Sequence, residues 1–459
     1  MPSGPHHSEL PPEVERTSRQ LVRGMGLAQA TSVNMLNMIG IGPFITIGTI
    51  ISAMGGPQAI LGWLLGALVA VCDGLVYAEL GAAMPGAGGA YIYFREAFNR
   101  ETWGRIFSFL FLWETIFVAP LSIAAACVGF GDYLGFASGF SHRGVTVSAM
   151  AACVLVAMLL YRPIAAVGRL SQVFLAIVLA ATLWVVVAGT IHMNVRMALD
   201  FPPGAFHLSR SFFAGLGSAT LFAMYNYGGY NNITYLGGEV QEPIKNIPRA
   251  IVLSILAVAV FYLLMSVTLI GTIPWRQAAT STAVVSEFIT RLYGSWAGVL
   301  ITVLILIATF GGIFTGTLGY SRILFAAGAE GHFFKVFGRA HPKGHFPTVA
   351  LVAVAALAIP LCGLPIEKLV GALMIIQVMF QFILQVLAVF AIRLFRREIE
   401  IPFRMWLYPW PALVALAGWV YVALTPAQRQ FVWEGAILVA AGLGAYLLRA
   451  RVVKEWPLA

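Results

Sequence analysis

Apolar residues along this chain gather into unbroken stretches of about 20 residues or more, and a helix of that length crosses roughly 30 Å of hydrocarbon. The stretches do not alternate apolar and polar positions, so they predict helices and not the strands of a membrane barrel. Inside lipid, a helix also satisfies the hydrogen bonds of its own backbone. The pattern predicts twelve transmembrane helices, at residues 31–53, 58–84, 105–130, 145–161, 170–191, 212–236, 250–272, 296–321, 348–364, 367–391, 406–424 and 431–448.

The composition agrees with this pattern. Hydrophobic residues occupy 59% of the 459 positions and charged residues only 10%, whereas soluble domains carry about 25% charged residues. A chain with so few charges cannot cover a water-facing surface. We therefore expect an all-α integral membrane protein.

The formal net charge of +9 would fit a nucleic-acid partner, so the distribution of the charge has to decide whether it indicates such a partner. With the N-terminus placed in the cytoplasm, 21 of the 28 Lys and Arg residues fall in cytoplasmic segments and 7 in outer segments. Membrane proteins keep positive charge inside in this way. The distribution predicts a multi-pass protein of the cell (plasma) membrane whose tails, 1–30 and 450–459, are both cytoplasmic, with no nucleic-acid partner.

Side-chain patterns that carry enzymatic or metal chemistry are missing from the sequence. The histidines lie in the N-terminal tail or in predicted loops, and no nucleophile–base pair occurs in or beside the spans. We expect no metal site, no cofactor and no enzymatic activity. The cysteines lack CxxC spacing and fall in or at the edge of apolar stretches, which is typical of small buried hydrophobes: Cys72, Cys127, Cys153 and Cys362.

Two of the predicted spans are interrupted near their middle. The first contains Gly40, Gly42 and Pro43, and the sixth contains Gly228 and Gly229. Proline lacks an N–H group and glycine destabilises a helix, so both segments should break the hydrogen-bond ladder. Either break alone has an alternative explanation as a packing feature or a kink, because both residue types are common in transmembrane helices.

The positions of the two breaks carry more information than their composition. The first and sixth helices are equivalent members of two five-helix halves, 31–191 and 212–391, which enter the membrane from opposite sides. Helices 11 and 12, within 403–449, are left over. This pairing predicts inverted repeats with a binding site where the broken helices meet.

A broken helix exposes backbone groups of opposite polarity. The N–H groups of Gly40, Ile41 and Gly42 begin a half-helix, and such an end carries partial positive charge that can hold a carboxylate. An amino acid presents a carboxylate and an ammonium group within a few ångströms, so its binding would need no ionised side chain. We expect the ammonium group to contact carbonyl oxygens at the ends of the other half-helices: those of Met38, Ile39, Tyr225, Asn226 and Gly228.

Tyrosines lie next to the second break. At the middle of the membrane an aromatic ring can cover a bound substrate and exclude water, so we expect Tyr225 to act as a gate, with Tyr227 as a second gating residue. The alternative is that both rings simply pack in the bundle.

Several stretches resemble the amino acid–polyamine–organocation (APC) superfamily. They are GIGPF at 40–44, YAELGAAMPGAGGAY at 77–91, GGEVQEPIKNIPRA at 237–250 and SRILFAAGAEGHFFKVFGRAHPKGHFPT at 321–348. LWETIFVAP at 112–120 and YNYGGYNN at 225–232 are most similar to its L-type amino-acid transporter branch and to related polyamine-uptake permeases. The resemblance implies a five-plus-five inverted-repeat (LeuT-like) fold with discontinuous helices 1 and 6. It also implies alternating access and amino-acid or polyamine substrates bound at the two breaks.

Three departures from the family pattern limit what the resemblance implies for this chain. Ile41 stands where the family often has a small polar residue. The fifth span, 170–191, lacks the lysine of some proton-coupled members, which leaves H⁺ and Na⁺ both open as coupling ions. The loop at 131–144 lacks the cysteine through which human L-type members join a glycoprotein, so we expect no disulfide-linked ancillary subunit.

Two acidic residues lie deep inside predicted spans. Asp73 and Glu114 are each about ten residues from the cytoplasmic end, or about 15 Å at 1.5 Å per residue. Ionisable groups at this depth are costly and face the bundle interior. Each is either a site for a proton or cation or a carboxyl that locks scaffold helices together. For Glu114, which belongs to the family-like stretch LWETIFVAP, the structural role is favoured, whereas both roles stay open for Asp73. Glu79 lies nearer the rim, where we expect it to pair with basic loop residues or helix ends.

The sequence therefore predicts a secondary active transporter of amino acids in the lipid bilayer. The alternative substrate is a polyamine or a cationic amino acid, for which Asp73 and Glu114 would have to face the pathway. A transporter-like sensor or a channel fits less well, because a channel does not need paired breaks in inverted positions.

Overall fold

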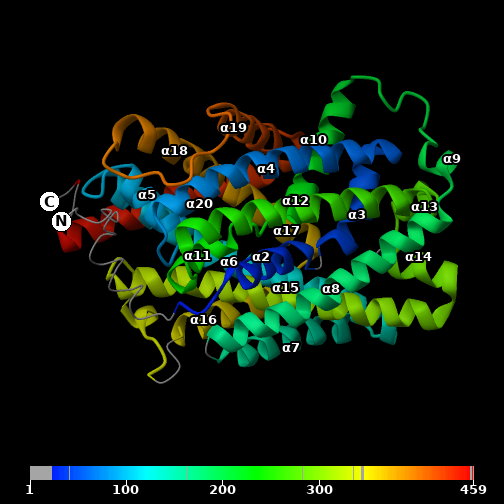
Figure 1. Ribbon diagram of the computed structural model, residues 1–459, viewed down its shortest axis with the longest axis horizontal. Coiled ribbons are helices and arrows are strands. Elements are labelled where there is room, and N and C mark those ends of the chain that lie inside the picture. Colours follow the sequence, from blue (N-terminus) through cyan, green and yellow to red (C-terminus); the bar gives the residue numbers. More distant parts are fainter. Residues whose placement is uncertain are drawn as a thin grey trace, which may run out of the picture.

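The computed structural model describes residues 23–454, apart from 41, 163, 282, 334 and 343–345, together with residue 457. The described backbone is helical, with isolated β-bridges and no extended strand. Figure 1 shows the long helices running side by side along the longest axis of the molecule. The predicted tail at 1–22 and Ile41 lie outside the described residues.

Eight helices in the described part of the chain are long and apolar enough to cross a membrane. Each falls on one of the apolar stretches that predicted a span. They are α4 (Ile60–Ala83), α6 (Trp103–Ser138), α7 (His142–Leu160), α8 (Ile164–His192), α12 (Pro243–Ile270), α15 (Ser295–Ala329), the continuous run of α17 (Ile366–Gln377), the π-helical turn η5 (Val378–Phe382) and α18 (Ile383–Phe395), and α20 (Arg429–Val453).

The first predicted span consists of two helices, α2 (Leu27–Ile39) and α3 (Gly42–Met54). They are bent by 42° relative to each other, and if the pair is one span the described chain has up to nine candidate spans. The break falls at the Gly-Ile-Gly-Pro segment, as the sequence predicts.

The remaining three predicted spans hold shorter or less apolar helices. They are α10 (Arg210–Tyr227) with α11 (Asn232–Tyr235), α16 (Val349–Ala358) with its continuation η4 (Ile359–Gly363), and α19 (Trp410–Ala423). All predicted ranges therefore contain helix, but only eight or nine meet the length and apolarity of a span. The count of twelve crossings stays a prediction.

Short helices link these elements. They are α5 (Ala90–Ala97), α9 (Val195–Ala198), α13 (Trp275–Ala278), α14 (Val284–Tyr293) and the 3₁₀ turns η1 (Pro57–Ala59), η2 (Gly237–Glu239), η3 (Lys335–Gly338) and η6 (Pro426–Gln428). We call the end of the bundle at which α5 lies, on the left in Figure 1, the α5 end.

The broken elements pack against one another and against the long helices. α2 packs against α8, α12 and α15, and α10 packs against α3 and α4. Ahead of α2, the N–H of Met25 donates to the Glu239 carbonyl (3.1 Å), and the N–H of Gln241 donates to the Met25 carbonyl (2.9 Å). These bonds tie the segment before α2 to the segment that follows the second break.

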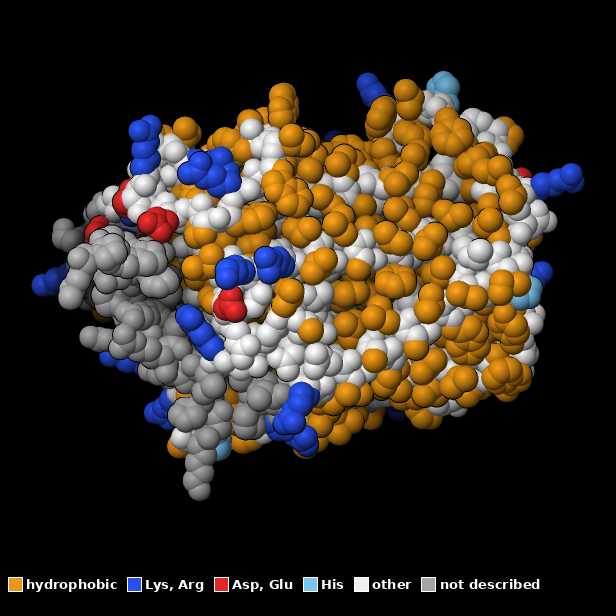
Figure 2. All heavy atoms as spheres, viewed as in Figure 1, with side chains coloured by type: hydrophobic (Ala, Val, Ile, Leu, Met, Phe, Trp, Pro, Cys, Tyr) orange, Lys and Arg blue, Asp and Glu red, His pale blue; other side chains and the backbone are white. Residues whose placement is uncertain are grey.

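The outer surface is apolar over most of its length. On the face in Figure 2, hydrophobic side chains cover the middle, and charged side chains gather mainly towards the α5 end. This is the surface that a bilayer requires. All four cysteines are buried, which confirms that they are small interior residues.

Candidate functional site

A cavity of about 90 Å³ lies where the two breaks meet. Both broken helices contribute to it, together with α6, α15, α17 and α19. Its lining from the breaks comprises Asn37, Met38, Gly40, Gly42, Met224, Tyr225, Gly228, Gly229, Tyr230, Asn231, Asn232 and Tyr235. The opposite wall includes Ser122, Ile123, Gly312, Gly316, Tyr320, Gln377 and Trp419.

At the first break, α2 ends at Ile39 and α3 begins at Gly42. The first N–H groups of a helix have no partner within it, so those of Gly42, Phe44 and Ile45 begin α3 as unpaired donors of the helix. Gly40 and Gly42 line the cavity, as does Met38, whereas Ile39 is buried but is not part of the lining.

At the second break, α10 ends at Tyr227 and the chain turns at two glycines before α11. Gly229 has φ +112°, a conformation that side-chain-bearing residues rarely adopt. The N–H of Gly228 donates to the carbonyls of Met224 (2.8 Å) and Tyr225 (3.2 Å), which occupies part of the acceptor capacity at this end. Tyr225 and Gly228 both line the cavity.

Asn226 does not line the cavity but joins the two broken helices. Its Nδ2 donates to Thr46 Oγ1 of α3 (2.6 Å) and to the Phe222 carbonyl (2.8 Å). Its Oδ1 is buried and has no hydrogen-bond partner among the described residues. The side chain therefore fixes α10 against the start of α3, a contact that the sequence did not reveal.

Tyr262 of α12 is a second residue that sequence reasoning missed. Its hydroxyl donates to the Met38 carbonyl (2.7 Å) and to the Asn226 carbonyl (3.3 Å), so one side chain bridges the ends of α2 and α10. The Met38 carbonyl, predicted as a substrate contact, thus already accepts one hydrogen bond. A lone tyrosine in an apolar span was the only signal in the sequence.

The two breaks are held close to α15 by small residues. A Cβ built on Gly312 would stand 2.8 Å from Gly40 Cα, too close for any larger residue without movement. Helix backbones approach this closely only where small residues meet. The contact places the end of α2 directly against α15.

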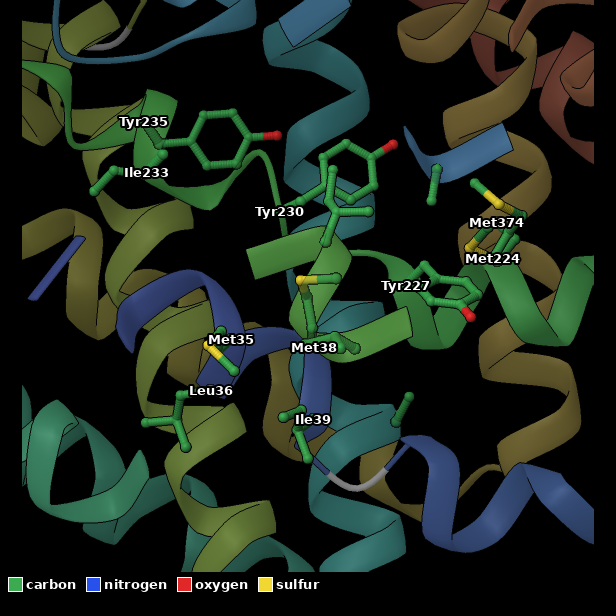
Figure 3. Packing of buried hydrophobic residues seen from close by; sticks show 14 of the residues in the cluster. Met35, Leu36, Met38, Ile39, Met224, Tyr227, Tyr230, Ile233, Tyr235 and Met374 are labelled. Carbon is green, nitrogen blue, oxygen red and sulfur yellow. The ribbon is translucent and has the colours of Figure 1, made fainter. Parts of the chain in front are cut away.

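The predicted gating tyrosines differ in position. Tyr225 is half-buried and lines the cavity. Tyr227 is fully buried and lies outside the lining, with its ring centroid 6.1 Å from that of Trp63 and 5.3 Å from that of Tyr262. Tyr230 lines the cavity instead, and Figure 3 shows it above the Met38 side chain while Tyr227 lies to one side. The structure therefore brings only one of the two predicted gates to the cavity.

Asp73 is fully buried and surrounded by donors. Its carboxylate accepts hydrogen bonds from Tyr230 Oη (2.5 Å), Gln385 Nε2 (2.7 and 2.8 Å) and Trp419 Nε1 (3.1 Å). It does not line the cavity, although Tyr230 and Trp419 do. These contacts join α4, α18 and α19 to the second break, as a structural carboxylate would.

Glu114 has a different environment. It is 3% exposed on α6, and neither carboxyl oxygen has a hydrogen-bond partner among the described residues. It does not line the cavity, but Ser122, two turns further along α6, does. A buried carboxyl without partners is costly to ionise, so this side chain is the better suited of the two acids to carry a proton.

Ionised side chains are absent from the described lining of the cavity, whose polar groups are backbone, amides and hydroxyls. No group of three or more His, Cys, Asp or Glu residues in the described chain is placed to hold a metal ion. Whatever polar ligand enters this cavity has to be held largely by neutral groups and helix ends.

Residues 25–446 match the model of a family described as amino acid permease. The chain belongs to the amino acid permease family. This confirms the resemblance carried by the sequence motifs. The family and its relatives are transporters and not enzymes, and the apolar helices fit a multi-pass membrane protein.

Curated relatives of this permease are amino acid transporters. It is 27% identical to the mouse (Mus musculus) cationic amino acid transporter 4 over 76% of this chain and 56% of that protein. It is also 27% identical to the mouse b(0,+)-type amino acid transporter 1, over 95% of this chain and 89% of the relative. The serine/threonine exchanger SteT of Bacillus subtilis (strain 168) is 27% identical over 88% of this chain and 90% of its own.

Proposed function

We propose that this permease carries small neutral amino acids across the membrane by alternating access, with the substrate held between the two helix breaks. The observation that carries the proposal is the central cavity, which lies at both breaks and has no ionised side chain in its described lining. A zwitterion needs one donor-rich and one acceptor-rich end, and broken helices supply both.

The carboxylate end is the start of α3. Gly42 lines the cavity and begins the helix, where unpaired N–H groups and the helix dipole favour a negative charge. A carboxylate there would accept from the N–H of Gly42 and of the adjoining Gly40–Ile41 segment. Ile41 is included as a prediction from the sequence.

The amino group would face the carbonyls at the ends of α2 and α10. Those of Met38, Tyr225 and Asn226 each already accept one hydrogen bond, but a carbonyl oxygen has two lone pairs and retains capacity. The carbonyls of Ile39 and Gly228 complete this proposed acceptor set. Tyr225 would cover the bound substrate as its gate.

The size of the cavity favours a small substrate. At roughly 15 Å³ for each water-sized group, its volume of about 90 Å³ accommodates on the order of six non-hydrogen groups. Alanine and serine are of this size. Leucine or a diamine would need the walls to move.

A polyamine or cationic amino acid is the alternative substrate, and one relative is named a cationic amino acid transporter. This reading needs acids facing the pathway, whereas neither Asp73 nor Glu114 lines the cavity. A diamine also has no carboxylate for the start of α3. The neutral substrate is therefore preferred.

The remaining parts of the proposal follow from the sequence. They are twelve crossings arranged as inverted repeats 31–191 and 212–391, both termini in the cytoplasm of a plasma-membrane protein, and coupling to H⁺ or Na⁺ or exchange. One relative is named the large neutral amino acids transporter small subunit 2 of Homo sapiens, a name that implies assembly with another subunit. The loop at 131–144 has no cysteine, so we propose no disulfide-linked subunit here.

Uptake by purified protein in liposomes tests this function. Radiolabelled alanine, serine, leucine, lysine and putrescine would be offered with and without H⁺ and Na⁺ gradients and with internal amino acid. We expect saturable uptake of alanine or serine that exceeds uptake of lysine and putrescine. Saturable uptake of putrescine but of no neutral amino acid would overturn the proposal.

A further inference from the structure

Four arginine side chains line a second cavity, at the α5 end of the bundle. Arg95 comes from α5, Arg100 from the turn that follows it, Arg105 from α6 and Arg449 from α20. The cavity has a volume of about 150 Å³, and Glu101 is the single carboxylate in its described lining. Four guanidinium groups around one small cavity offer many N–H donors to an anion.

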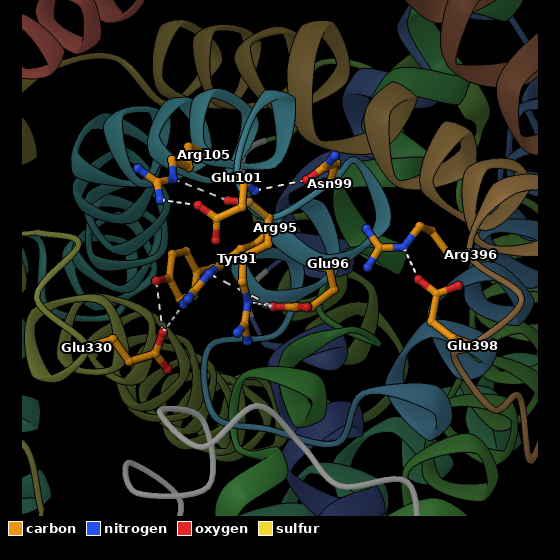
Figure 4. Close-up of polar contacts among 10 residues, drawn as sticks. Tyr91, Arg95, Glu96, Asn99, Glu101, Arg105, Glu330, Arg396 and Glu398 are labelled. Carbon is orange, nitrogen blue, oxygen red and sulfur yellow. Dashed lines mark hydrogen bonds and ion pairs between the residues drawn. The ribbon is translucent and has the colours of Figure 1, made fainter. Parts of the chain in front are cut away.

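Three of these guanidinium groups are held in place by carboxylates. Arg95 Nη1 contacts Glu330 Oε2 (2.9 Å), Arg105 Nη2 contacts Glu101 Oε2 (2.5 Å), and Arg100 Nε contacts Glu96 Oε1 (3.1 Å). Figure 4 shows the Arg105–Glu101 contact next to the contacts of Arg95 with Glu330 and Glu96. Each guanidinium has five N–H donors, so these contacts leave donors for a second ligand.

Arg100 has a donor that these contacts do not use. Its Nη2 is buried and has no hydrogen-bond partner among the described residues. A buried donor without an acceptor is destabilising, and more so when the group is charged. An oxyanion in the cavity would remove this penalty.

The cavity borders the apolar outer surface of α20. Leu448 and Val452, on either side of Arg449, are 71% and 82% exposed. Trp103, at the start of α6, is 56% exposed, and tryptophan is enriched where a protein meets the membrane–water boundary. An acyl chain can therefore lie along α20 while its headgroup reaches the arginines.

We propose that this cavity binds the phosphate of an anionic phospholipid, whose acyl chains lie along the exposed face of α20. Phosphate oxygens match the planar fork of arginine donors, and basic pockets between transmembrane helices bind such headgroups in other membrane proteins. A zwitterionic lipid carries a compensating cation and binds less tightly. The site is separate from the proposed amino-acid cavity.

The test titrates the purified full-length protein in detergent with phosphatidylglycerol or phosphatidylcholine and counts bound lipid by native mass spectrometry. In Arg100→Gln we expect the dissociation constant for phosphatidylglycerol to rise about 10-fold, equivalent to 1.4 kcal/mol, with phosphatidylcholine unaffected. Ser108→Leu, which fills the cavity without removing charge, should weaken the same lipid. Arg162→Gln is the control, since Arg162 is exposed in the turn after α7.

Either of two results with the variants would overturn the proposal. One is an unchanged phosphatidylglycerol affinity in both Arg100→Gln and Ser108→Leu proteins whose melting temperatures match the unmodified chain. The other is equal weakening in Arg162→Gln, which would mean diffuse attraction and no site. Competition by inorganic phosphate separates the sources: full displacement of the lipid at millimolar phosphate would assign the cavity to a soluble anion instead.

Discussion

A methyl group added to Gly42 would enter the space of the Asn226 side chain. An ideal Cβ there overlaps Asn226 Oδ1 and stands 3.2 Å from its Cγ. Asn226 cannot retreat freely, because its Nδ2 donates to Thr46 Oγ1 and to the Phe222 carbonyl. Breaking these bonds costs about 1 kcal/mol each, and leaving a buried group unpaired costs about 1–3 kcal/mol more. We expect Gly42→Ala to lose about 3–5 kcal/mol in all, divided between unfolding and substrate binding.

Equilibrium binding of the transported amino acid, measured beside the melting temperature of the purified protein, checks this value. Gly42→Ala should bind at least about tenfold more weakly, or 1.4 kcal/mol. Gly444→Ala is the matched control, because a Cβ on Gly444 of α20 would meet nothing within 4 Å. Binding within twofold of the unmodified protein in Gly42→Ala would refute the proposed carboxylate site.

Three further substitutions test the surroundings of the breaks. Tyr262→Phe leaves carbonyls of both broken helices without their donor, so we expect the free energy of unfolding to fall by about 1–3 kcal/mol. Thermal unfolding measures this change, and an unchanged melting temperature would contradict the role of Tyr262. Gly312→Ala forces a Cβ to within 2.8 Å of Gly40 Cα. The overpacking costs about 1–3 kcal/mol and should reduce uptake about tenfold. Normal uptake would argue against the close approach of Gly40 to α15. Glu114→Gln should transport without pH dependence, whereas Asp73→Asn should keep the pH profile of uptake and melt at a lower temperature. An unaltered pH profile of uptake in Glu114→Gln would exclude Glu114 as the proton site.

The positions of the helices could be predicted because they depend on local patterns. Every range marked by a continuous apolar stretch proved to contain helix. The first break fell at Gly40–Pro43 because proline and glycine interrupt a helix whatever surrounds it. Glu79 was expected to pair at the rim. Its carboxylate accepts two hydrogen bonds from Arg393 (2.7 Å each) and one from the N–H of Met405 (2.7 Å), which confirms that prediction.

The contacts that fix the breaks could not be predicted, because they join residues far apart in sequence. Asn226 reaches Thr46 across 180 positions, and Tyr262 reaches Met38 across 224. No periodicity or spacing marks such pairs in one sequence. The same limit applies to Tyr227, since a tyrosine beside a break can face the cavity or the opposite side, and only packing against Trp63 decides which.

A structure of the protein with a bound amino acid would show directly whether the two breaks hold the substrate. We expect the carboxylate to lie within hydrogen-bond distance of the N–H of Gly42 at the start of α3. We also expect the ammonium group to face the carbonyls at the ends of α2 and α10. An amino acid bound away from both breaks, or with its carboxylate and ammonium positions exchanged, would contradict this expectation.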